Sequence, residues 1–262
     1  MVNGVRTHYL KAGRGEPVIL IHGFTGNHAM WYLQVPALAK RYRVIAYDAR
    51  GHGDSEHPGS GYDLSTLVSD LAGLMDQLEI QKAHLVGLSM GGMIVQRFGL
   101  AFPERAADLT IADSFPGRPD AKVLEIFQEH VQIGRDQGLT VLFARLLVHP
   151  ALPIGPDFRV PLPFVKAFQD AFLKNRLATM AAFVEMFLGL PDWSQELQNI
   201  KSPTLLIVGD HDLPCLAPMQ KMAGQIPDSE LFIIPRCGHS SPLEKADRFN
   251  ELLLKFVEKH PL

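Results

Sequence analysis

Short runs of apolar residues recur along the chain and are separated by segments with a different period. The runs occupy residues 18–21, 44–47, 84–88, 109–112, 204–208 and 231–234. They are continuous rather than alternating, which is typical of strands that are covered on both faces of a parallel sheet. Helical spacing separates them, for example over residues 64–78, where Asp63 is a candidate N-cap, and over residues 249–257. Strands that alternate with helices predict an α/β fold with a doubly wound, mostly parallel sheet.

The alternation is interrupted in the middle of the chain. Residues 117–191 have helical patterns at 121–132, 140–147 and 165–188, with a proline-rich break at 150–163. We expect this middle segment to form a helical layer, inserted between two strands of a core made of residues 1–116 and 192–262. At the N-terminus, Asn3 and Gly4 predict a tight turn that opens a hairpin.

The composition excludes several classes of protein. Of the 262 residues, 47% are hydrophobic, which is enough for a large core, and the formal net charge of −3 offers no basic surface for nucleic acid. The cysteines, Cys215 and Cys237, are too few for a disulfide framework and fit a reducing compartment. The chain begins without the apolar core of a signal peptide, and no apolar stretch is long enough to span a membrane. We therefore expect a cytoplasmic protein with neither a nucleic-acid nor a membrane partner.

A G-x-S-x-G motif follows the apolar run at 84–88. Ser89 lies between Gly87 and Gly91, with a strand pattern before it and a helical pattern after it. A serine on such a sharp strand-to-helix turn has an exposed hydroxyl, and the glycines are needed because side chains would clash in the turn. The following helix directs free N–H groups at any negative charge that develops near the hydroxyl. This context predicts that Ser89 is a nucleophile.

Two further polar residues follow later apolar runs. Asp212 comes after the run at 204–208, and His239 comes after the run at 231–234. The order serine, aspartate, histidine, with each residue just after a strand, resembles that of serine α/β-hydrolases. The chain, apart from its less recognisable middle segment, is similar to the small, capped, esterase-like or enol-lactonase-like members of that superfamily.

The resemblance implies a role for each of these residues. Ser89 would attack the substrate, His239 would take its proton, and Asp212 would orient the imidazole. The backbone N–H groups of Phe24 and Met90 would stabilise the oxyanion. The middle segment would be a cap over the active site, and no cofactor is implied.

Two other carboxylates compete with Asp212 for the role of the acid. Asp210 lies in the same loop, and Asp113 follows the run at 109–112, the strand from which some relatives take their acid. The glycine three residues before it favours Asp212. A metal site at Asp210, His211 and Asp212 is disfavoured, because no matching group of ligands completes it.

Other polar residues near these loops are expected to have structural roles. The chain has 11 histidines, so a histidine by itself carries little information, and His22 and His52 are expected to order their loops. Asp48, Arg50 and Asp54 resemble the loop after the second strand of the hydrolase sheet. We expect a network that holds this loop in place rather than a catalytic cluster.

Apolar residues near Ser89 and in the middle segment are candidates for the substrate pocket. The five candidates are Phe24, Phe115, Phe168, Phe172 and Met186. No group of lysine or arginine residues that would bind an anionic substrate is evident, so we expect an uncharged ester or lactone as the substrate. We expect no metal ion in the site. The favoured activity is cleavage of carboxylic esters of short to medium acyl chain through an acyl-enzyme.

Other functions are compatible with the same triad. Carbon–carbon bond hydrolases usually carry an aromatic residue after the catalytic histidine, where this chain has Ser240. Cofactor-free perhydrolases and enol-lactonases have a motif similar to that at residues 87–92. A ligand receptor built on the hydrolase fold would keep the triad and turn over slowly. Epoxide hydrolases and haloalkane dehalogenases are disfavoured, because they need a carboxylate where Ser89 stands.

Overall fold

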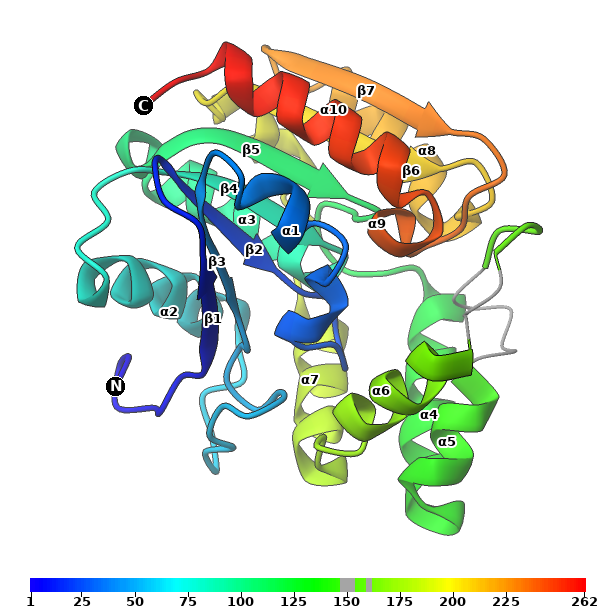
Figure 1. Cartoon of the computed structure of the whole chain (residues 1–262). Helices are drawn as coiled ribbons and strands as arrows, with labels where there is room; N and C mark the ends of the chain where they lie inside the picture. The colour runs from blue at the N-terminus through cyan, green and yellow to red at the C-terminus, as the bar shows by residue number, and fades with distance from the viewer. Residues whose placement is uncertain (147–153, 159–161) are drawn as a thin grey trace.

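A seven-stranded sheet forms the centre of the computed structural model, which describes residues 1–146, 154–158 and 162–262 (Figure 1). The strands are β1 (Tyr9–Ala12), β2 (Pro17–Ile21), β3 (Arg43–Tyr47), β4 (Ala83–Leu88), β5 (Ala106–Ala112), β6 (Thr204–Gly209) and β7 (Ser229–Ile234). Their order in the sheet is β1-β3-β2-β4-β5-β6-β7, and only the pairing of β1 with β3 is antiparallel. The predicted mostly parallel α/β sheet is confirmed.

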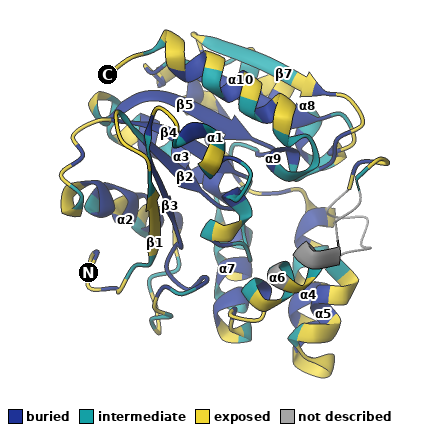
Figure 2. Cartoon of the chain, in the orientation of Figure 1, coloured by how far each residue is buried: buried dark blue, intermediate teal, exposed yellow. Residues whose placement is uncertain are grey.

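The central strands β2 to β6 are almost wholly buried, as Figure 2 shows. Burial on both faces explains why their sequences are continuous apolar runs. Strand β1 was not predicted, because it lies at the edge of the sheet and three of its four residues are exposed. The turn at Asn3 and Gly4 forms, with positive φ at both residues, but it closes a single bridge between Val2 and Val5 rather than a hairpin of two strands.

Helices cover both faces of the sheet. Helices α2 (Leu64–Gln77), α3 (Met90–Ala101) and α8 (Leu213–Ala223) pack on one face, and α1 (Val35–Leu38) and α10 (Ala246–Lys259) pack on the other. The shorter elements are η1 (His28–Trp31), η2 (Pro103–Arg105), η3 (Ser194–Asn199) and α9 (Ser241–Glu244). The side chain of Asp63 accepts the Thr66 N–H at 2.8 Å, so the predicted N-cap of α2 is confirmed.

Four helices lie between β5 and β6 in the chain: α4 (Ala121–Gln137), α5 (Leu139–Leu146), α6 (Leu162–Phe172) and α7 (Leu177–Gly189). Figure 1 shows them gathered beside the sheet, and they share an apolar cluster of their own that includes Val131, Leu142 and Met180. We call α4 to α7 the cap helices.

The single helix predicted over residues 165–188 is wrong, because the chain turns between α6 and α7. Asn175 in this turn donates from Nδ2 to Phe172 O at 2.8 Å and to Thr25 O at 3.0 Å. These bonds tie the turn to the loop after β2, so the break is made by a tertiary contact. Half of the predicted proline-rich break at 150–163, namely residues 150–153 and 159–161, lies outside the described residues.

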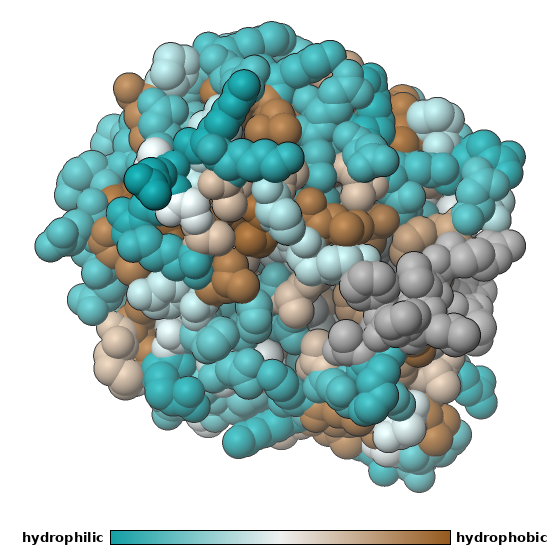
Figure 3. All heavy atoms as spheres, in the orientation of Figure 1, coloured by the Kyte–Doolittle hydropathy of each residue, from teal (hydrophilic) through white to brown (hydrophobic). Residues whose placement is uncertain are grey.

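On the coloured part of the face in Figure 3, brown side chains lie in small groups among hydrophilic ones. Exposed large apolar residues come from separate elements, among them Tyr9, Val141 and Leu213. Scattered residues of this kind are normal on a globular surface. Within the described ranges, no helix is both long enough and apolar enough to cross a membrane.

Candidate active site

Ser89 occupies the turn between β4 and α3. Its φ is +54°, in the left-handed region that non-glycine residues rarely adopt. A Cβ atom at Gly87 would overlap Gly91 O, and one at Gly91 would overlap Ile21 O. The chain can therefore make this turn only with glycine at both positions. The turn places the Ser89 side chain just beyond the carboxyl end of β4.

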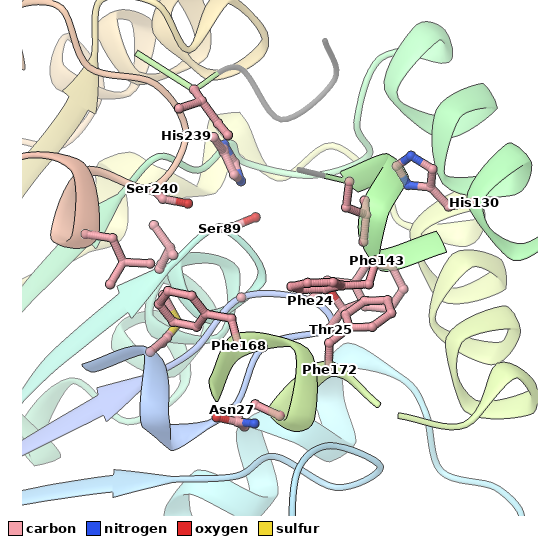
Figure 4. Close-up of a pocket in the computed structure, with 18 of the residues that line it drawn as sticks. Phe24, Thr25, Asn27, Ser89, His130, Phe143, Phe168, Phe172, His239 and Ser240 are labelled. Atoms are coloured by element: carbon pink, nitrogen blue, oxygen red, sulfur yellow. The ribbon is translucent and has the colours of Figure 1, made fainter. Parts of the chain in front are cut away.

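His239 and Asp212 meet beside this turn. His239 Nδ1 lies 2.9 Å from Asp212 Oδ2, and the Asp212 side chain is fully buried. Figure 4 shows the His239 ring above the Ser89 hydroxyl. Because Nδ1–H is held by the carboxylate, Nε2 is the nitrogen left to accept a proton. Cys215 Sγ also lies 3.7 Å from His239 Nδ1.

The electrostatic surroundings make His239 a stronger base than a free histidine. Burial of the ring lowers its pKa, but the charge of Asp212, the hydrogen bond to Asp212 and the charge of Asp113 outweigh this effect and raise the pKa above its ordinary value. A histidine beside a buried carboxylate can therefore take a proton from a neighbouring hydroxyl and hold it.

Two backbone N–H groups lie next to Ser89. Met90 is the first residue of α3, so its N–H has no partner within the helix. Phe24 follows Gly23, where an added Cβ would lie 3.3 Å from Ser89 Cβ. Among the described residues, neither the Phe24 N–H nor the Met90 N–H has a hydrogen-bond acceptor. Both are available as donors to an oxyanion.

The two rival carboxylates have other partners. Asp113 is fully buried and accepts the backbone N–H groups of Gly209 and Ser241, each at 3.0 Å. Asp210 accepts from Cys237 N at 3.2 Å and lies 2.7 Å from the ring of its neighbour His211. Of the three carboxylates, Asp212 is the one that is hydrogen-bonded to His239.

A cavity of about 260 Å³ opens beside Ser89 and His239 (Figure 4). Of the five predicted pocket residues, Phe24, Phe168 and Phe172 line it. The prediction is wrong for Phe115 and Met186, which pack against the large apolar cluster under the sheet. Helical spacing shows which residues share a face, but the face that carries Met186 is turned toward the core.

Several lining residues were missed in the sequence. They are Asn27, Met30, Phe127, His130, Phe143, Leu146, Ile154, Phe158, Ala171, Leu243 and Glu244. Phe127 and His130 are three residues apart on α4, so their shared face was visible, but not the element it faces. The ring of Phe24 lies 5.5 Å from that of Phe127 and 5.4 Å from that of Phe187, so Phe24 joins the loop after β2 to the cap helices.

Glu244 is the only Asp, Glu, Lys or Arg among the described lining residues. Its carboxylate accepts the N–H groups of Gly155 at 2.6 Å, Gly238 at 2.8 Å and Ser240 at 3.2 Å. Glu244 thus joins residues 154–158, which lie between α5 and α6 in the chain, to the loop of His239. The described lining holds neither a lysine nor an arginine that would pair with a substrate carboxylate.

The polar residues of the loops after β2 and β3 form hydrogen bonds within these loops and with their neighbours. His22 Nε2 accepts the Ala49 N–H at 3.0 Å. Asp48 accepts the N–H groups of His28 at 2.6 Å and Asp54 at 2.8 Å, whereas Arg50 pairs with Asp70 of α2. These bonds shape the loop after β3, and none of these groups lines the cavity.

Two groups of described residues have the ligand types and spacing for a metal ion. One is His8, His28 and Asp48, and the other is Asp212, Cys215 and His239. In the first, Asp48 is already satisfied by hydrogen bonds from His28 and the following loop. In the second, the histidine and aspartate bond each other. In both groups the carboxylate is therefore already bonded to a histidine, which disfavours a metal ion there.

The chain matches the model of the alpha/beta hydrolase fold over residues 16–246. It is 33% identical over 270 residues to the 2-hydroxy-6-oxononadienedioate/2-hydroxy-6-oxononatrienedioate hydrolase of Paraburkholderia phymatum, covering 97% of this chain and 91% of that protein. Among solved structures, it is similar to the enol-lactonase from Burkholderia xenovorans, with a TM-score of 0.88, 29% identity and 98% of both chains covered. A thermophilic esterase from Thermogutta terrifontis has a TM-score of 0.86 and 30% identity, covering 98% of this chain and 94% of that one. This chain therefore belongs to the α/β-hydrolase fold family.

Proposed function

We propose that the protein hydrolyses uncharged carboxylic esters of short to medium acyl chain, with Ser89, His239 and Asp212 as its catalytic triad. The observation that carries this proposal is the cavity beside Ser89. Its walls are mainly phenylalanine and other apolar side chains, and its described lining includes neither lysine nor arginine. Such a cavity binds apolar groups and offers no partner to an anion.

The proposed reaction has two halves. His239 Nε2 takes the proton of Ser89 as Oγ attacks the ester carbonyl, and the charge of Asp212 stabilises the imidazolium. The N–H groups of Phe24 and Met90 donate to the oxyanion. His239 then gives the proton to the leaving alcohol as the C–O bond breaks. In the second half, His239 deprotonates a water molecule, which attacks the acyl carbon. His239 then returns the proton to Ser89 Oγ as the acyl C–O bond breaks and the acid leaves.

We also propose that residues 117–191 act as a cap that limits the length of the substrate. Phe127, Phe143 and Phe172 from three cap helices line the cavity, together with Phe24 from the loop after β2. These rings oppose the triad across the cavity in Figure 4, where Phe143 and Phe172 are labelled. A long acyl chain would have to displace them.

The charge of the lining bears on the choice among related activities. The substrate named for the Paraburkholderia relative is a dioate, which carries two carboxylates. Here the described lining holds the carboxylate of Glu244 and no lysine or arginine, so a dianion would be repelled. Hydrolysis of an uncharged lactone is the second candidate, because a lactone is a cyclic ester and the enol-lactonase covers 98% of this chain.

Esters of increasing acyl length should show a maximum of kcat/KM. Each buried methylene contributes about 0.8 kcal/mol, or roughly a fourfold gain, until the cavity is full. We expect kcat/KM for p-nitrophenyl esters to rise from acetate, to peak at about four to eight carbons, and to fall for longer chains. The measurement is kcat/KM from acetate to palmitate, with a hemisuccinate ester as the charged control. A maximum at palmitate, or no ester turnover beside rapid cleavage of a vinylogous diketone, would contradict the proposal.

The activity should rise with pH across the neutral range. Only the unprotonated form of His239 accepts the serine proton, and protonation below its pKa abolishes this form. Because the pKa of His239 is raised, the acid limb of kcat/KM should lie above the ordinary histidine value of about 6.5. The profile is measured on an uncharged ester at constant ionic strength. An acid limb below about pH 6 would show that the neighbouring carboxylates do not act on His239 in this way.

A further inference from the structure

Two consecutive residues at the end of β5 contact the loops of all three triad residues. Ser114 Oγ donates to Ser89 O at 2.8 Å. Asp113 Oδ1 accepts the Gly209 N–H, at the start of the loop to Asp212, and Asp113 Oδ2 accepts the Ser241 N–H, two residues after His239. Strand β5 lies between β4 and β6, so this dipeptide is placed to reach its neighbours on both sides.

The backbone of Asp113 is held in an unfavourable conformation. Its φ is +46°, which aspartate tolerates better than most residues but which still costs free energy. Its N–H donates to Ile207 O at 2.9 Å and so continues the pairing of β5 with β6. A strained, fully buried carboxylate persists only where its surroundings fix it. Here the two backbone N–H groups that it accepts fix it.

The surrounding glycines leave little room for this dipeptide to move. An added Cβ at Gly92, in the first turn of α3, would lie 2.7 Å from Ser114 Cβ. An added Cβ at Gly209 would overlap Cys237 O and Gly238 O, just before His239. The nucleophile turn, the loop of the acid and the loop of the histidine are therefore in close contact around Asp113, and a shift there is transmitted to all three.

Asp113 also adds a second buried carboxylate near His239. The titratable groups around it are Asp212, His239, Cys215, Cys237 and Glu244. Burial and the charge of Asp212 raise the pKa of Asp113. Burial also raises the pKa of both thiols, so the cysteines stay neutral. A raised pKa favours the uncharged carboxyl form of Asp113, so the charge that favours the imidazolium of His239 comes mainly from Asp212.

We propose that Asp113 is a positioning residue that aligns the loops of Asp212 and His239 with Ser89. This inference rests on the proposed serine-hydrolase function. Asp113 is not a member of the proposed triad, because both of its carboxylate oxygens accept backbone N–H groups. A purely structural aspartate would affect stability alone, whereas this one also affects the reactivity of Ser89.

The matched variants are Asp113→Asn and Asp108→Asn. Asp108 is also fully buried on β5, but near the other end of the strand, where its carboxylate bonds the His84 ring at 2.6 Å. For Asp113→Asn we expect kcat to fall about 10- to 100-fold with KM within about threefold. The amide turns its NH2 toward one of the two N–H donors and displaces the loop that this donor belongs to. Asp108→Asn should lower the Tm and leave kcat unchanged.

Two readouts separate this inference from the proposed function. The values of kcat and KM are measured with an ester, and the rate of labelling of Ser89 by a fluorophosphonate is measured under the same conditions. Failure of the wild type to react at Ser89 would overturn both. Wild-type reaction at Ser89, with the same kcat and the same labelling rate in Asp113→Asn, would overturn only the role of Asp113.

If Asp113→Asn does not fold, Asp113→Glu provides the test, because it keeps the carboxyl group and changes its reach. We expect kcat of this variant to fall with KM within about threefold, since the longer side chain displaces the two loops. A wild-type kcat would contradict the positioning role.

Discussion

Ser89→Ala is expected to lower kcat by about 10⁴-fold or more while the protein stays folded. The variant removes the only atom that forms the proposed acyl-enzyme, and alanine is no larger than serine, so the turn after β4 is preserved. The loss is measured as kcat on the best p-nitrophenyl ester, with Tm as the check on folding. A fluorophosphonate should label the wild type at Ser89 and leave the variant unlabelled.

The control for this experiment is Ser69→Ala. Ser69 is exposed on α2 and bonds only the backbone of the preceding turn, so its loss should leave kcat unchanged. Labelling of another serine in the cavity, such as Ser240, or near-normal activity of Ser89→Ala would show that the nucleophile has been assigned to the wrong residue.

Asp212→Asn is expected to have the second largest effect, a loss of about 10⁴-fold in kcat with little change in KM. The amide would donate to His239 Nδ1 and so place the imidazole proton on Nε2, where the base must be free. It also removes the charge that stabilises the imidazolium. The measurement is kcat and KM on the same ester, together with Tm.

Asp210→Asn and Asp113→Asn are the comparisons for this variant. Asp210 lies in the same loop but faces His211 and Cys237, so we expect a loss of no more than a few-fold. Asp113→Asn should fall between the two, as its positioning role implies. If Asp113→Asn were the more damaging change, the acid would belong to β5, and the pairing of Asp212 with His239 would not be the catalytic one.

The sequence predicted best those strands that are buried on both faces of the sheet. Strands β2 to β6 are covered on both faces, so their apolar runs are unbroken and were found, as was the N-cap of α2. Strand β1 was missed because an exposed edge strand has no such run. The break between α6 and α7 was missed because Asn175 is held by Thr25, which lies 150 residues away in the chain.

The same distinction holds for the site. The motif around Ser89 needs glycines for local steric reasons, so sequence alone could indicate the nucleophile and place Asp212 and His239 after neighbouring strands of a parallel sheet. The sequence did not predict most of the residues that line the cavity. Helical periodicity gives the faces of α4 and α7 but not what they face, so Phe127 was missed and Met186 was wrongly included.

By itself, then, the sequence determined the fold class and the order of the candidate triad, because both depend on local steric and burial patterns that each segment carries. Only the tertiary structure decided which of three carboxylates bonds His239, which cap side chains line the cavity, and how Asp113 bridges two loops. These depend on distances between segments that are far apart in the chain. Such distances follow from how the elements pack, and no periodicity within one segment encodes them.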